Sequence, residues 1–103
     1  MDFINITMKE GVQLAQKKNN LLVDVREPAQ YKKGHLKSAI NIPYGIIQKK
    51  EDVENKSLIV YCDYGGQSML AARHLAKEGY IVYNIVGGVH YYRGQLTALG
   101  FTR

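Results

Sequence analysis

The sequence has very few of the residues that tie a chain to disulfides or to zinc. Among its 103 residues there is a single cysteine, Cys62. One cysteine excludes an internal disulfide and a zinc site built from several cysteines. A lone thiol stays available in a reducing compartment, so we expect a cytoplasmic protein.

Long apolar runs are missing as well. No stretch approaches the ~20 apolar residues that span a membrane. The segment from Met1 to Asn5 does not combine a basic region with an apolar run, so we expect no secretion signal. The sequence therefore predicts a protein that does not associate with membranes.

The chain also lacks a dense run of basic residues, although its net charge is +5. A positive charge of this size is compatible with a nucleic-acid partner. The basic residues are scattered in pairs at Lys17–Lys18, Lys32–Lys33 and Lys49–Lys50. Scattered pairs are typical of a solvated surface, so we predict no nucleic-acid partner.

Hydrophobic residues make up 46% of the chain, which indicates that residues 1–103 form a single folded domain. Strand-like and helix-like segments alternate along it. The expected strands are Phe3–Ile6, Leu21–Val25, Ala39–Ile42, Ser57–Tyr61 and Tyr80–Ile85. The expected helices are Thr7–Lys18, Pro28–Tyr31, Tyr44–Lys49, Ser68–Glu78 and Val89–Leu99. This alternation predicts an α/β domain with a mainly parallel sheet.

Unusual residues follow three of the expected strands, in the segments Asp24–Glu27, Cys62–Ser68 and Val86–Gly88. The carboxyl ends of parallel strands meet at one edge of a sheet, and ligands bind beyond that edge. We therefore expect these three segments to lie on one rim of the domain.

The segment that begins with Cys62 carries the strongest chemical signal. Gly65 and Gly66 accept positive φ angles, which lets successive N–H groups turn inward as an anion-binding nest. The helix that follows adds free amides and a partial positive charge, and both favour the nucleophilic thiolate. We predict that Cys62 is catalytic rather than an inert packing residue. The predicted anion-binding loop consists of Asp63, Tyr64, Gly65, Gly66, Gln67 and Ser68.

Four segments, in order, match one family pattern. Asp24–Glu27 contains Asp-x-Arg, and Gly34–Pro43 reads Gly-His-Leu-Lys-Ser-Ala-Ile-Asn-Ile-Pro. Cys62–Ser68 matches an active-site loop, and Gly87–Gly88 precedes Tyr92, where a tryptophan is common. From Leu21 to about Gly94 the chain thus resembles a single-domain rhodanese, a protein of the thiosulfate sulfurtransferase type.

The resemblance implies a five-stranded, mainly parallel sheet with helices on both faces. It also implies an enzyme that needs no metal and no organic cofactor. Cys62 would take a sulfane sulfur from thiosulfate or a persulfide donor and hold it as a persulfide. Cyanide, a thiol or a protein acceptor would then remove the sulfur.

Several other residues receive supporting roles. We expect Asp24 and Arg26 to brace the site, with an ordinary surface ion pair as the alternative. His35 is predicted to be structural, through a hydrogen bond of its ring. Ser68 is predicted to cap the helix while its amide or hydroxyl faces the anion. Tyr64 either lines the pocket entrance or faces solvent.

Gln67 departs from the family pattern, because active members often carry arginine at that position. Arginine offers a charged fork of donors, whereas glutamine offers one neutral amide. We expect weaker thiosulfate binding or a different donor, and a catalytically weak binding or regulatory module stays open as the alternative. A phosphatase of the Cys-x5-Arg class is disfavoured, because Ser68 stands where that class needs arginine.

Overall fold

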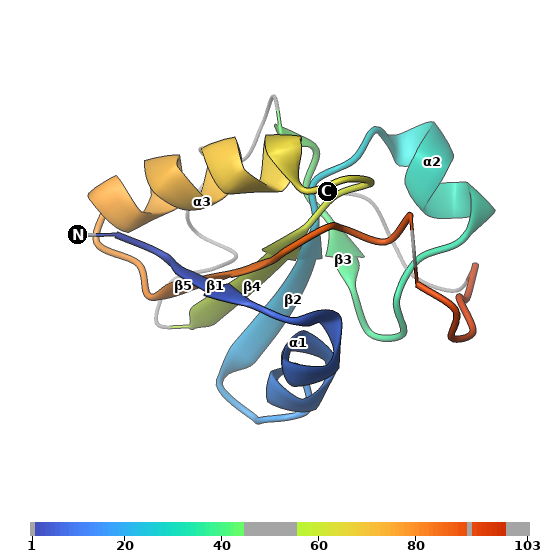
Figure 1. Ribbon diagram of the computed structural model, residues 1–103, viewed down its shortest axis with the longest axis horizontal. Coiled ribbons are helices and arrows are strands. Elements are labelled where there is room, and N and C mark those ends of the chain that lie inside the picture. The colour runs from blue at the N-terminus through green and yellow to red at the C-terminus, as the bar shows by residue number, and fades with distance from the viewer. Residues whose placement is uncertain (1, 45–55, 91, 99–103) are drawn as a thin grey trace.

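The computed structural model describes residues 2–44, 56–90 and 92–98 (Figure 1). They form an α/β domain around a five-stranded sheet, in which every neighbouring pair is parallel and the order is β1-β5-β4-β2-β3. The strands are β1 (Ile4–Ile6), β2 (Asn20–Asp24), β3 (Ile40–Asn41), β4 (Ser57–Tyr61) and β5 (Val82–Ile85). The helices are α1 (Met8–Leu14), α2 (Pro28–Lys33) and α3 (Gly66–Lys77).

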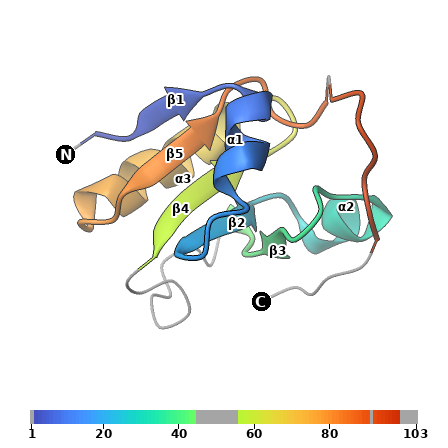
Figure 2. The ribbon, with the colours of Figure 1, turned by 90° about the horizontal axis from the view of Figure 1, so that it is seen from below.

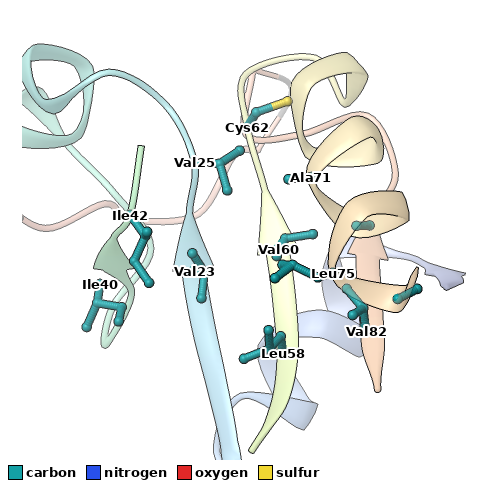
Figure 3. Close-up of a cluster of buried hydrophobic side chains, with 12 residues drawn as sticks. Val23, Val25, Ile40, Ile42, Leu58, Val60, Cys62, Ala71, Leu75 and Val82 are labelled. Carbon is teal, nitrogen blue, oxygen red and sulfur yellow. The ribbon is translucent and has the colours of Figure 1, made fainter. Parts of the chain in front are cut away.

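Helices cover both faces of the sheet, as the family resemblance implies. Figures 1 and 2 show α3 on one face and α1 on the other. Alternate residues of the central strand β4 enter two separate cores. Leu58 and Val60 pack in the cluster that includes Leu75 of α3 (Figure 3). Ile59 and Tyr61 pack in the cluster on the other face. Both faces are apolar because a parallel sheet is buried on both sides.

The first helix begins as predicted but ends early. Thr7 and Glu10 form a capping box, in which the Thr7 amide donates to Glu10 Oε1 at 2.9 Å and the Glu10 amide to Thr7 Oγ1 at 3.1 Å. The helix stops at Leu14 instead of Lys18. The side chain of Asn20, at the start of β2, donates from Nδ2 to the Leu14 carbonyl at 2.8 Å. This contact satisfies a carbonyl at the helix end and turns the chain into β2.

The predicted helix over residues 89–99 is wrong for the residues that the structure describes. From 92 to 98 the chain contains an isolated antiparallel bridge between Thr97 and His35. The His35 amide donates to the Thr97 carbonyl at 2.9 Å, and the Thr97 amide donates back at 2.8 Å. Backbone groups that a helix would pair locally are used here to attach the tail to the turn after α2.

The other expected elements are found within a few residues of their predicted bounds. Most of the expected helix Tyr44–Lys49 lies outside the described residues. In the described part of the chain, no helix has both the length and the apolar character that crossing a membrane requires.

Candidate active site

The carboxyl ends of β2, β4 and β5 meet at one edge of the sheet, and Figure 3 shows Cys62 there beside the start of α3. The segment after β5 is attached to the cysteine loop by its backbone. The Val89 amide donates to the Cys62 carbonyl and the His90 amide to the Asp63 carbonyl, each at 2.8 Å. Gly88 has φ of 65°, and a Cβ at this position would overlap the Asp63 carbonyl. The close approach therefore requires glycine.

Backbone amides surround the sulfur of Cys62, a residue that is only 3% exposed. The Gly65 amide donates to Sγ at 3.1 Å, and the Ser68 amide donates at 3.3 Å. Gly65 is left-handed, with φ of 103°, and α3 begins at Gly66 directly after it. Amides of a first helical turn lack partners inside the helix, so the Ser68 amide is free to reach the sulfur. This arrangement is an anion-binding nest with the thiol at its centre.

Ser68 does not cap α3, contrary to the prediction. Gly65 is the N-cap, and Ser68 lies buried in the first turn. Its hydroxyl donates to Asn84 Oδ1 at 2.6 Å, and its Oγ lies 3.5 Å from Cys62 Sγ. Asn84 comes from β5 and was not predicted as a site residue. A buried polar residue inside an otherwise apolar strand is the signal that could have found it.

Asp24 and Arg26 form a buried ion pair, not a surface pair, with exposed fractions of 0% and 5%. Arg26 Nη2 lies 2.6 Å from Asp24 Oδ2, and Arg26 Nε donates to both carboxylate oxygens at 3.0 Å. Burial by itself lowers the pKa of Arg26, but the hydrogen bonds and charge of Asp24 outweigh it, so the pKa is raised. The Asp24 carboxylate also accepts from the Arg26 amide at 2.9 Å.

The guanidinium of Arg26 is committed to protein groups. Besides Asp24, its Nη2 donates to the Gly34 carbonyl at 2.7 Å, and its Nη1 lies 3.4 Å from Asp63 Oδ1. Asp63 also accepts from Gln30 Nε2 of α2 at 2.5 Å. Arg26 therefore orients the loop through Asp63, and Gln30 is a second anchor that the sequence did not reveal.

Tyr61 and His35 are structural parts of the same region. The Tyr61 hydroxyl accepts from the Leu36 amide at 3.0 Å. Burial, followed by the charge of Asp24, raises the pKa of Tyr61 far above its ordinary value, so the phenol stays neutral. The His35 ring stacks on Tyr31 at 3.6 Å between centroids, and its Nδ1 lies 2.8 Å from the Tyr31 carbonyl.

Tyr64 and Gln67 are exposed side chains of the cysteine loop, and the surface that they form is called the mouth of the site. Tyr64 is 62% exposed and its ring lies 4.3 Å from that of His90, so it faces solvent. Gln67 is also exposed. Among the described residues, no group of three or more His, Cys, Asp or Glu side chains is arranged to hold a metal ion.

Comparison with known proteins agrees with this geometry. The family model "Rhodanese-like domain" matches residues 7–95. The chain belongs to the rhodanese-like domain family. Thiosulfate sulfurtransferase GlpE of Coxiella burnetii is 32% identical to this rhodanese-like domain over 92 residues, which cover 85% of each chain.

Two solved structures resemble this rhodanese-like domain over most of its length. A rhodanese-like domain protein from Staphylococcus aureus superposes with a TM-score of 0.76 at 25% identity, covering 96% of this chain and 99% of the other. A rhodanese from E. coli, solved with anions, has a TM-score of 0.64 at 30% identity, covering 76% and 96%. The fold of this rhodanese-like domain is thus similar to that of both solved structures.

The structure also bears on the phosphatase alternative. That class requires an arginine at position 68 to hold three phosphate oxygens. In this rhodanese-like domain Ser68 is fully buried and its hydroxyl bonds to Asn84. The residue at this position is therefore a neutral side chain paired with Asn84, and it supplies no guanidinium to a phosphate.

Proposed function

We propose that this rhodanese-like domain is a sulfurtransferase that carries a sulfane sulfur as a persulfide on Cys62. The observation that carries the proposal is the pair of amides, from Gly65 and Ser68, that donate to Sγ at 3.1 and 3.3 Å. Such donors favour an anionic sulfur without any charged side chain. Similarity to a thiosulfate sulfurtransferase over 85% of both chains supports the same chemistry.

The first step transfers sulfur to the protein. The Cys62 thiolate attacks the outer sulfur of thiosulfate, and a new S–S bond forms as the S–S bond of thiosulfate breaks. Sulfite leaves with the electron pair of the broken bond. With a persulfide donor, the leaving group is the thiolate of the donor. In both cases the product is the Cys62 persulfide.

The second step transfers sulfur to an acceptor. Cyanide or a thiolate attacks the outer sulfur of the persulfide, and the bond to Cys62 breaks. Cys62 leaves as a thiolate, while the acceptor becomes thiocyanate or a new persulfide. A protein thiol is an equally suitable acceptor. Electrons and protons balance without a metal or an organic cofactor.

The remaining residues hold this chemistry in place. The loop formed by residues 63–68 receives the donor, and the positive end of α3, which begins at Gly66, favours its negative charge. Asp63 ties the loop to Arg26 and, through Arg26, to Asp24. A reducing cytoplasm is the compartment that we propose, because the single thiol must stay reduced between turnovers.

A catalytically weak binding or regulatory module is the second candidate, and Gln67 favours it. This exposed side chain is neutral, so the mouth lacks the fork of charged donors that arginine supplies at this position in many active relatives. The loss of one charge-assisted contact is worth on the order of 1.5–3 kcal/mol of donor binding. Such a loss weakens thiosulfate binding without removing the nucleophile.

Intact-mass spectrometry separates the two candidates. The reduced protein is incubated with thiosulfate, and in parallel with a low-molecular-weight persulfide. We expect a gain of one sulfur atom that disappears on adding cyanide and is absent in Cys62→Ser. Because Cys62 is the single cysteine of the chain, any gain reports on this residue alone. A folded protein that gains no sulfur from either donor would be the binding module.

A further inference from the structure

A chain of polar groups leads from Cys62 through the sheet to its edge. Ser68 Oγ lies 3.5 Å from Cys62 Sγ, and the Ser68 hydroxyl donates to Asn84 Oδ1 at 2.6 Å. Asn84 Nδ2 then donates to Asn5 Oδ1 at 3.1 Å. Ser68 and Asn84 are fully buried, whereas Asn5 is exposed on the edge strand β1. The sulfur is thus linked to an exposed amide that is far from it in sequence.

The structure orients Asn5 and Asn84 so that each hydrogen bond of this chain has a defined direction. The Oδ1 atom of Asn5 accepts, so the NH2 group of Asn84 must point toward it and the carbonyl oxygen of Asn84 toward Ser68. An oxygen at 2.6 Å takes the one hydroxyl proton of Ser68, which therefore points away from Cys62. The lone pairs of Ser68 Oγ then face the sulfur and match the S–H donor of a neutral thiol.

When Cys62 loses its proton to water, the Ser68 hydroxyl is favoured to point toward the sulfur instead of toward Asn84. A thiolate has no hydrogen to donate, and its best third partner beside the two amides is the Ser68 hydroxyl turned toward it. That turn leaves Asn84 Oδ1, which is buried, without the donor that it has in this structure. A buried acceptor that loses its donor destabilises the arrangement. The Gly65 carbonyl, 3.3 Å from Ser68 Oγ, is a weaker acceptor for the same hydroxyl. Asn84, at the shorter distance, and the Cys62 thiolate are therefore the main competitors for one proton.

We propose that Asn84 is a positioning residue that limits the thiolate fraction of Cys62 by retaining the hydroxyl proton of Ser68. The consequence of this role for sulfur transfer rests on the proposed function. A less acidic thiol is a stronger nucleophile once ionised but a poorer leaving group. Asn84 thereby sets the balance between the step that loads sulfur and the step that releases it.

The test follows the pH dependence of alkylation of Cys62 by iodoacetamide, read by intact mass. Asn84→Leu removes the acceptor at similar volume. We expect the alkylation midpoint to move to lower pH and the thiolate fraction at neutral pH to rise roughly three- to ten-fold. In a Ser68→Ala background the same substitution should change that fraction by less than roughly two-fold. An equal change in both backgrounds, or a shift to higher pH, would overturn the proposal.

A surface pair of variants keeps the test decisive if Asn84→Leu does not fold. Asn5→Ala removes the acceptor that orients Asn84, so the amide can turn its NH2 group to Ser68 and release the hydroxyl proton. We expect a shift to lower pH in Asn5→Ala and none in Asn5→Asp, which keeps an acceptor at this position. Equal behaviour of the two variants would contradict the proposal. Alkylation needs no sulfur donor, so this outcome is independent of whether Cys62 carries sulfur.

Discussion

Two neighbouring strand ends at the rim of the sheet are built in opposite ways. After β4, Cys62 is held by the backbone amides of Gly65 and Ser68. After β2, a carboxylate and a guanidinium are buried together, and most of their contacts are with each other. Within the part of the chain that the structure describes, the hydrogen bonds to the sulfur after β4 come from uncharged groups, whereas the strand end after β2 carries a buried pair of opposite charges.

The difference shows how the site separates reactivity from rigidity. In the proposed reaction, the backbone amides of Gly65 and Ser68 would support a negative sulfur both before and after transfer, because backbone amides do not titrate. Arg26 contacts the cysteine loop through Asp63, so we propose that its charge fixes the position of the loop rather than binding the donor directly. Substitutions at the two strand ends should therefore have different consequences: those after β2 should change stability, and those after β4 should change the environment of the sulfur.

Breaking the ion pair after β2 should have the largest effect on stability. Asp24→Asn removes the nearer of the two carboxylates that pair with the buried Arg26 and leaves it only Asp63 at 3.4 Å, so we expect the free energy of unfolding to fall by about 3 kcal/mol. Urea unfolding measures the change. Glu27→Gln, at an exposed carboxylate close by, is the matched control and should lie within about 0.5 kcal/mol of the wild type. Similar free energies of unfolding for the two variants would mean that the ion pair does not stabilise the fold.

Displacing the loop after β4 should lower the free energy of unfolding by a smaller amount, but it should also change the reactivity of Cys62. Gly88→Ala places a methyl group against the Asp63 carbonyl at a positive φ, and we expect a loss of about 2 kcal/mol or more. The rate of alkylation of Cys62 should change as well, because the loop must shift. For comparison, Gly66→Ala meets no atom within 4 Å and should be stabilising by about 0.5–1 kcal/mol. An unchanged rate of alkylation in Gly88→Ala would show that the segment after β5 does not control the position of the cysteine loop.

The neutral phenol between the strand ends predicts a loss of stability at high pH. The pKa of Tyr61 is raised in the folded protein, so its contribution is fully present below about pH 10 and is lost as the pH rises above that value. Urea unfolding of the wild type should show a fall of about 1.4 kcal/mol per pH unit there from this one group. Tyr61→Phe should remove that slope, whereas Tyr64→Phe, at an exposed tyrosine, should retain it. If both variants keep the slope, Tyr61 is not its origin.

Adding a charge at the mouth should have the smallest effect, and it should fall on donor binding alone. In steady-state assays, Gln67→Arg is expected to lower the KM for thiosulfate about ten-fold, because it supplies one charge-assisted contact. Gln67→Glu should raise the KM, and neither variant should change stability, because the side chain is exposed. A KM that stays constant in Gln67→Arg would show that Gln67 does not limit affinity.

The elements that formed as predicted are those with a local cause. The capping box at Thr7 places the start of α1, and the positive φ of Gly65 allows the tight turn before α3. Gly66, which was expected to share this role, is instead the first helical residue and has no positive φ. The errors lie where a distant contact competes with a local preference. Asn20 ends α1 by binding the Leu14 carbonyl, and His35 holds Thr97 in a bridge where a helix was expected.

The sequence by itself determined the alternating α/β order, the three special strand ends and the identity of the thiol, because periodicity, glycine placement and a single cysteine are local properties. Only the tertiary structure decided that Asn84 reaches Ser68, that Gln30 holds Asp63, and that Arg26 is fully engaged by protein groups. These contacts join residues from different strands and helices. Hydrogen bonds between such partners depend on how the elements pack, and no spacing along the chain encodes them.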